Sequence, residues 1–169
     1  MENSIRIAGI VKESIVDGPG IRLVVFAQGC NHHCPGCHNP QTHSFQEGTW
    51  METDEILELI RRNPLLDGVT FSGGEPFEQS DAFASLAEQI KPLKLNVMTY
   101  TGYTYEELLD GCKGIPGWRR LLDATDLLVD GRFELARRNL LLKFRGSENQ
   151  RIIDMRRTRE TGRLIQAEI

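Results

Sequence analysis

The feature that most constrains this chain is a group of three cysteines, Cys30, Cys34 and Cys37, in a Cys-x3-Cys-x2-Cys pattern. Three thiolates on one short loop can bind three irons of a cubane iron–sulfur cluster and leave the fourth iron without a protein ligand. That open iron can bind and activate a small molecule, whereas a cluster with four protein ligands only transfers electrons. The spacing therefore predicts a loop that holds a 4Fe-4S cluster with one open iron.

Clustered cysteines are also found in zinc sites and in disulfide frameworks. A structural zinc site takes four nitrogen or sulfur ligands, usually from two short cysteine pairs, but Cys112 is isolated here. Zinc would therefore need a fourth ligand from the histidines His32, His33, His38 and His43. Disulfides fit less well, since no secretory leader is visible and the cytosol keeps thiols reduced. We favour the cluster and expect a cytoplasmic protein.

Size and composition limit the remaining classes of function. At 169 residues, with 40% hydrophobic and 26% charged residues, the chain suits one globular domain over residues 1–169. Its apolar runs are too short to span a membrane, and its net charge of −4 argues against binding to nucleic acid phosphates. Arginines gather near the C-terminus, where the stretch from about residue 154 is expected to be a peripheral tail.

Strand and helix patterns alternate along the chain. Alternating or compact apolar runs predict strands at residues 4–11, 21–26, 68–72, 93–100, 126–130 and 151–153. Helices are expected from Thr53 and Ser80, both read as N-caps, from Thr104, which forms a capping box with Glu107, and at 133–138.

This alternation implies parallel strands joined by helical crossovers, and hence an α/β protein. A closed eight-stranded barrel takes about 250 residues, so we expect a partial, open βα barrel or an open sheet. Ligands bind at the C-terminal ends of such strands. Four loops follow strands at that edge, namely the cysteine loop, residues 73–76, Thr101-Gly102 and Gly131. We expect them to form one site.

The cysteine pattern, the Ser-Gly-Gly-Glu-Pro strand end at residues 72–76 and the βα alternation together resemble the radical S-adenosylmethionine enzymes. Segments 17–22, 29–40, 130–133 and 144–151 are more specifically similar to the activating proteins of the anaerobic (class III) ribonucleoside-triphosphate reductase. The resemblance extends from about Ile5 to Ile153. It implies a single-domain partial barrel of the radical S-adenosylmethionine type.

The resemblance also implies an activity. Cys30, Cys34 and Cys37 would ligate the 4Fe-4S cluster, whose open iron chelates S-adenosylmethionine as cofactor. One electron, supplied by a flavodoxin or ferredoxin, would cleave the sulfonium and give a 5′-deoxyadenosyl radical. That radical would take a hydrogen atom from a glycine in the large subunit of the anaerobic ribonucleotide reductase.

Residues that contact S-adenosylmethionine follow from the same resemblance. Backbone groups of Gly73 and Gly74 can approach a ligand closely because these residues lack Cβ. Glu75 would accept a hydrogen bond from the ammonium group of the ligand. An ordinary strand-to-helix turn also explains the two glycines.

Other contacts are expected around the same edge. The backbone of Gly36 and the side chain of His38 are expected near the adenine, although a loop histidine is often only a surface residue. Asp130 and Arg132 follow a buried strand, and Arg132 would pair with the methionyl carboxylate. The alternative for the last two is a surface ion pair of little energetic value. Arg22 is expected to fix the cysteine loop or the backbone of a partner.

Three alternatives to the reductase activase stay open. The first is another glycyl-radical activase, of the pyruvate formate-lyase type, but such chains are typically longer and some carry an inserted ferredoxin-like domain that this sequence lacks. The second is an iron–sulfur protein without catalysis. The third is a zinc-binding interaction module.

Overall fold

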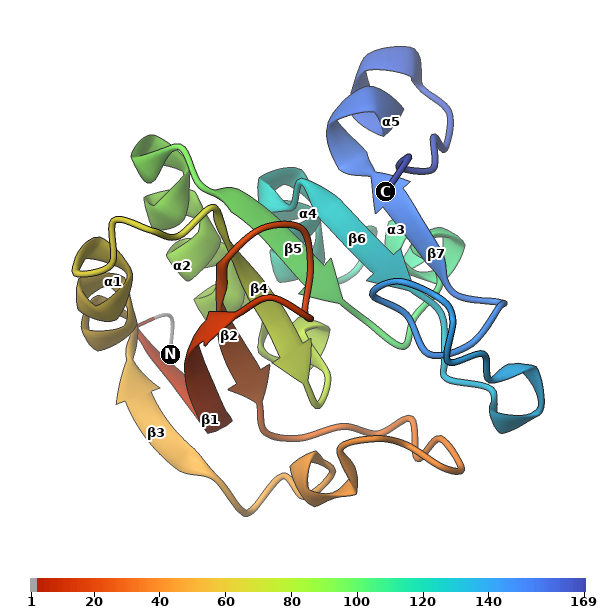
Figure 1. The fold of residues 1–169 in the computed structure, drawn as a ribbon, viewed down its shortest axis with the longest axis horizontal. Coiled ribbons are helices and arrows are strands. Elements are labelled where there is room, and N and C mark those ends of the chain that lie inside the picture. Colours follow the sequence, from red (N-terminus) through yellow and green to blue (C-terminus); the bar gives the residue numbers. More distant parts are fainter. Residues whose placement is uncertain (1–2) are drawn as a thin grey trace.

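In the computed structural model, which describes residues 3–169, one seven-stranded sheet organises the protein (Figure 1). The strands lie in the order β3-β1-β2-β4-β5-β6-β7. Their bounds are β1 (Ser4–Ser14), β2 (Arg22–Ala27), β3 (Thr49–Glu52), β4 (Gly68–Gly73), β5 (Asn96–Tyr100), β6 (Leu127–Asp130) and β7 (Arg151–Asp154). The four central strands β2, β4, β5 and β6 are parallel, and β1, β3 and β7 are antiparallel to their neighbours. The expected parallel sheet and its open ends are confirmed.

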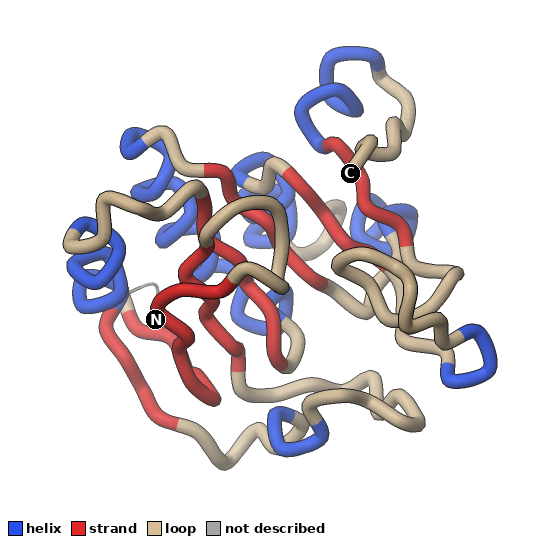
Figure 2. The backbone as a smooth tube through the Cα atoms, in the orientation of Figure 1, coloured by secondary structure: helices blue, strands red, loops and turns tan. Residues whose placement is uncertain are grey.

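Helices cover one face of this sheet, except for the last helix, which lies beyond the end of β7 (Figure 2). The helices are α1 (Thr53–Arg61), α2 (Ser80–Ile90), α3 (Tyr105–Gly111), α4 (Pro116–Ala124) and α5 (Met155–Thr161). Apolar strand residues pack beneath them, as Phe71 does against Phe83 of α2, with ring centroids 4.8 Å apart. Burial of this large core is the main favourable contribution to folding.

The other face of the sheet carries a smaller apolar cluster and a buried arginine. Met98, Val129 and Ile152 form the cluster. Arg22, only 1% exposed, donates hydrogen bonds to the Thr70 hydroxyl, the Pro19 carbonyl, and other oxygens on β4 and β5. Burial lowers its pKa to about 10.

The expected role of Arg22 was wrong. Its hydrogen bonds join the β1–β2 connection to the start of β4 and β5, far along the strands from the cysteine loop that follows β2. Arg22 therefore holds the strands together at the edge opposite the cysteine loop.

The predicted N-caps of the helices were confirmed for one helix and were wrong for two. Thr104 and Glu107 form the expected capping box of α3. Glu52 and Gln79, however, are the N-caps of α1 and α2, and neither uses its side chain. Both helices begin at the residue expected to cap them. At the start of α1, the Thr53 amide donates to the Asn3 carbonyl.

Several elements differ from the sequence pattern. Strand β3 and helices α4 and α5 were not predicted, and residues 133–138 contain only a single 3₁₀ turn, Leu135–Arg137. The stretch from 154 forms α5 and then returns along β7, where the Ala167 amide donates to the Ile152 carbonyl. No helix within residues 3–169 combines the length and apolar character needed to cross a membrane.

Replacing Arg22 by methionine tests its structural role. We expect Arg22→Met to lower the free energy of unfolding by about 3 kcal/mol, because several buried acceptors lose a charged donor. Urea unfolding of anaerobically handled protein, followed by tryptophan fluorescence, measures this. Arg62→Met, which removes an exposed pair with Glu58, is the control and should change the value by less than about 0.5 kcal/mol. Equal effects in the two variants would contradict the assignment.

Candidate functional site

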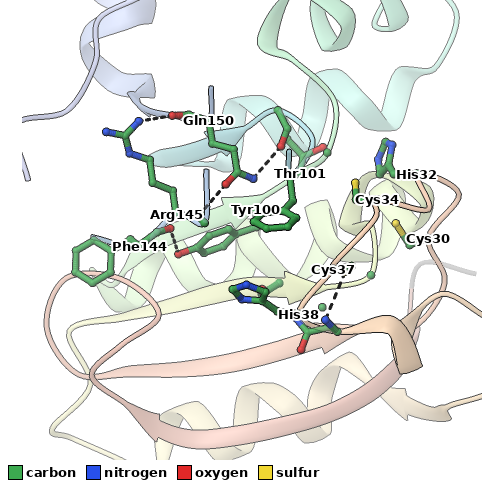
Figure 3. A pocket seen from close by; sticks show the side chains of 18 of the residues that line it. Cys30, His32, Cys34, Cys37, His38, Tyr100, Thr101, Phe144, Arg145 and Gln150 are labelled. Atoms are coloured by element: carbon green, nitrogen blue, oxygen red, sulfur yellow. Dashed lines mark hydrogen bonds between the residues drawn. The ribbon is translucent and has the colours of Figure 1, made fainter. Parts of the chain in front are cut away.

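A cavity of about 420 Å³ opens at the C-terminal ends of the parallel strands (Figure 3). All four loops expected at this edge contribute to its lining. The cysteine loop, Gly73-Gly74, Thr101-Gly102 and Gly131 are brought together there. The predicted convergence is confirmed, and it results from the shared direction of β2, β4, β5 and β6.

The cysteine loop leaves β2 and presents Cys30, Cys34 and Cys37 to the cavity. Its two ends are closed by backbone hydrogen bonds, from the Gly29 amide to Thr42 and from the Cys30 amide to His43. Within the loop, the Asn39 amide donates to the Cys37 sulfur at 3.4 Å. Such N–H···S bonds help set the potential of a bound cluster.

The environment of two of the thiols, those of Cys30 and Cys34, favours their protonated form. Burial raises the pKa of Cys30 to about 11 and also raises the pKa of Cys34. The charge of Arg132 partly opposes the shift at Cys34. Iron binding must therefore supply the free energy that deprotonates these thiols.

The donor set at the cavity is three thiols from one loop, the ligand type that iron–sulfur clusters take. Ligands of one ion converge on a point, and no group of three or more His, Cys, Asp or Glu side chains does so among the described residues. Thiolates of a cubane instead bind separate irons around a larger volume. His32, one candidate for a fourth zinc ligand, has its Nε2 atom 2.6 Å from Glu75.

Gly73 and Gly74 lie where the strand β4 meets the cysteine loop. A Cβ on Gly73, whose φ is +84°, would lie 2.7 Å from the Ala27 nitrogen, and a Cβ on Gly74 would lie 2.5 Å from the Gly29 carbonyl oxygen. Glycine is thus required for packing against the chain that leads into the cysteines. Both glycines also line the cavity, as expected for ligand contacts.

Glu75 has a different environment from the one expected. Its side chain is fully buried and does not line the cavity. Its carboxylate accepts hydrogen bonds from His32, from the Thr101 hydroxyl, and from the Gly102 and Phe77 amides. Protein donors thus occupy this carboxylate in the structure, and a hydrogen bond from the ligand's ammonium group stays a prediction.

Asp130 and Arg132 also lie outside the cavity. Both line a second hollow beside β6 and β7, and only Gly131 between them reaches the cysteine cavity. Asp130 binds Arg151 and the Tyr105 amide, whereas Arg132 pairs with Glu107 at 3.1 Å. The expected pairing of Arg132 with a ligand carboxylate stays a prediction; the alternative of an ion pair on the surface matches its pair with Glu107.

Of the two residues expected near an adenine, only one lines the cavity. His38 lines the cavity, and its ring centroid lies 5.3 Å from that of Phe133. Gly36 does not line it; its φ is +74°, and a Cβ there would meet Leu135 at 2.9 Å. Gly36 is thus explained by backbone conformation and packing.

The sequence did not predict the part of the cavity wall that residues 144–150 form. Phe144, Arg145 and Gln150 line the cavity there, together with Tyr100 of β5 (Figure 3). Gln150 accepts from the Gly146 and Ser147 amides and donates to the Gly131 carbonyl, so it closes this loop on itself. Segment 144–151 carries part of the family resemblance, but nothing in its sequence indicates that it faces the cysteines.

Comparison with known proteins also indicates a 4Fe-4S protein. A family model described as a 4Fe-4S single cluster domain matches residues 16–153. The anaerobic ribonucleoside-triphosphate reductase-activating protein of Vibrio cholerae is 35% identical over 145 residues, which cover 80% of this chain and 89% of that protein. The chain belongs to this family of activating proteins. A member from Enterobacteria phage T4 is 31% identical over 146 residues, with 81% and 86% covered.

Two further likenesses are more limited. The pyruvate formate-lyase-activating enzyme of Clostridium pasteurianum is 41% identical over 113 residues, which cover 62% of this chain and 48% of that enzyme. The crystal structure of QueE from Escherichia coli superimposes with a TM-score of 0.50 at 16% identity, covering 60% of this chain and 53% of QueE. The QueE likeness concerns the fold alone, and with the open sheet it confirms the expected partial barrel.

Gly74→Ala tests the close packing at the cavity edge. The added methyl group would meet the backbone of Gly29, which can move only with the cysteine loop. We expect the free energy of unfolding to fall by about 1–3 kcal/mol and the iron content after anaerobic reconstitution to fall with it. Gly114→Ala, where nothing lies within 4 Å of the added atom, should match the parent protein. Unchanged iron in Gly74→Ala would disprove the packing argument.

Proposed function

We propose that this protein is a radical S-adenosylmethionine activase that generates a glycyl radical on an anaerobic ribonucleoside-triphosphate reductase. The observation that carries the proposal is one cavity lined by three cysteines of a single loop and by the Gly73-Gly74 turn. Family membership supports it, since the relatives that cover most of the chain are named as activating proteins of that reductase.

The proposed cofactors are a 4Fe-4S cluster and S-adenosylmethionine. Cys30, Cys34 and Cys37 would hold the cluster, which supplies an electron and an open iron for reductive cleavage of S-adenosylmethionine to a 5′-deoxyadenosyl radical. The backbone of Gly73 and Gly74 would bind the amino acid part of the ligand, and His38 would lie beside its adenine. Gly36, Glu75, Asp130 and Arg132 remain expected contacts of the ligand, although none of them lines the cavity in this structure.

The protein itself would contribute position and exclusion of water. Tyr100 and the loop that includes Phe144 and Gln150 enclose the side of the cavity opposite the cysteines (Figure 3). Enclosure matters for a reactive carbon radical, since solvent and stray hydrogen donors would quench it. The substrate hydrogen would come from a backbone glycine of the reductase large subunit, and a flavodoxin or ferredoxin would supply the electron.

A second candidate is the activase of another glycyl-radical enzyme. The 41% identity with the pyruvate formate-lyase-activating enzyme favours it locally. The reductase-activating relatives, however, match over 80% or more of this chain and 86% or more of their own length. We therefore place the reductase first.

The decisive experiment offers both substrates to the same preparation. Anaerobic protein with reconstituted cluster, a reductant and S-adenosylmethionine is incubated with the reductase or, in parallel, with pyruvate formate-lyase. We expect a glycyl radical doublet by electron paramagnetic resonance with the reductase, together with release of 5′-deoxyadenosine and methionine. A doublet only with pyruvate formate-lyase would select the second candidate. If neither incubation released 5′-deoxyadenosine and methionine, activase function would be contradicted.

Cysteine variants provide the matched control. Cys37→Ser should abolish the doublet and lower the iron content, because one thiolate ligand is lost. Cys112→Ser should behave as the parent, since Cys112 does not line the cavity. Loss of the cluster in both variants, or in neither, would contradict the three-cysteine site.

A further inference from the structure

His32 is a buried residue of the cysteine loop that the proposed chemistry does not use. It lies between Cys30 and Cys34, and its side chain is only 5% exposed. Its Nε2 atom lies 2.6 Å from the Oε1 atom of Glu75, whose side chain has no exposure. Because this histidine is buried beside the cysteines, it is not simply a surface residue of the loop, and its position calls for an explanation.

The partners of Glu75 determine the direction of this hydrogen bond. Oε1 also accepts from the Thr101 hydroxyl at 2.9 Å and from the Gly102 amide at 2.8 Å, while Oε2 accepts from the Phe77 amide at 3.0 Å. A carboxylate that receives these donors acts as an acceptor, so the network assigns the Nε2 hydrogen to His32. His32 therefore donates from the cysteine loop to the carboxylate.

The imidazole ring is also enclosed on its flanks. The ring of Tyr103 meets it edge-on, with centroids 4.6 Å apart. A Cβ on Gly102 would lie 2.4 Å from the His32 ring, so the ring occupies the space that a side chain at 102 would need. Burial, packing and a hydrogen bond thus fix the ring in one orientation.

We propose that His32 and Glu75 form a positioning pair that holds the cysteine loop in register with the ligand-binding edge of the sheet. The pair connects the loop after β2 with the turns after β4 and β5, which carry Gly73-Gly74 and Thr101-Gly102. Its effect is to set the distance between the cluster and the backbone that receives S-adenosylmethionine. This inference rests on the proposed function.

A register role makes a specific prediction. Loss of the hydrogen bond should leave the three thiolates able to bind iron but should misplace the cluster relative to the ligand. Outer hydrogen bonds of this kind typically change affinity by about 10- to 100-fold. His32→Leu removes the donor, whereas His32→Gln keeps an amide N–H that can reach Glu75.

The test is a titration followed by electron paramagnetic resonance. Reconstituted, reduced protein is titrated with S-adenosylmethionine, and the change in the cluster spectrum gives the apparent Kd. We expect His32→Leu to retain iron and to need about 10- to 100-fold more ligand, while His32→Gln stays within about threefold of the parent. His33→Asn is the matched control, because His33 neighbours His32, does not line the cavity, and has a φ of +52° that asparagine tolerates.

The possible outcomes distinguish a failure of the positioning pair from a failure of the proposed function. A parent protein whose cluster spectrum ignores S-adenosylmethionine would contradict the proposed function itself. A responsive parent with His32→Leu of equal affinity, or with His32→Gln impaired as strongly as His32→Leu, would overturn the positioning pair. Loss of iron from His32→Leu would also contradict it, because the pair is inferred to place the cluster and not to be needed for its assembly.

Glu75→Gln gives a second, independent variant. The amide keeps the shape of the side chain but presents a donor to groups that already donate. The effect of His32→Leu on the apparent Kd should be smaller in the Glu75→Gln background than in the parent, because the hydrogen bond that the two residues share is already disturbed there. Additive effects would show that the two residues act separately and would overturn the pair.

Discussion

The site depends on one buried carboxylate. Glu75 receives hydrogen bonds from His32 after β2, from Phe77 after β4, and from Thr101 and Gly102 after β5. Three loops that are far apart in sequence are thereby fixed against one another at a single edge. A buried group with this many partners is costly to disturb, because each lost bond leaves an unpaired donor in a medium of low dielectric.

The two ends of the parallel strands have different roles, one structural and one in forming the site. At their N-terminal ends, Arg22 joins the β1–β2 connection to β4 and β5. At their C-terminal ends, the cysteine loop, the glycine turns and the wall containing Gln150 enclose the cavity. The helices bury the main core on one face, so the loops at the edge can carry function without contributing most of the stability.

Sequence reasoning predicted the parts that follow from periodicity and strand direction. The parallel order, the capping box at Thr104 and the meeting of four loops at one edge needed only these rules. Residue type alone does not reveal the orientation of a side chain. Arg132 and Asp130 follow a strand at the right edge, yet they turn into a second hollow and pair with Glu107 and Arg151. Glu75 is acidic and adjacent to the glycines, but its burial and four donors become visible only in three dimensions.

The central claim is that three thiolates hold a cubane whose fourth iron stays open to a small ligand. Mössbauer spectroscopy of anaerobic protein reconstituted with iron-57, recorded without and with S-adenosylmethionine, tests this most directly. The account predicts a 4Fe-4S cluster in which one iron site changes its parameters when the ligand is added, while the other three do not. Absence of a cubane would contradict it. So would a cubane in which the Mössbauer parameters of all four irons stay the same when the ligand is added.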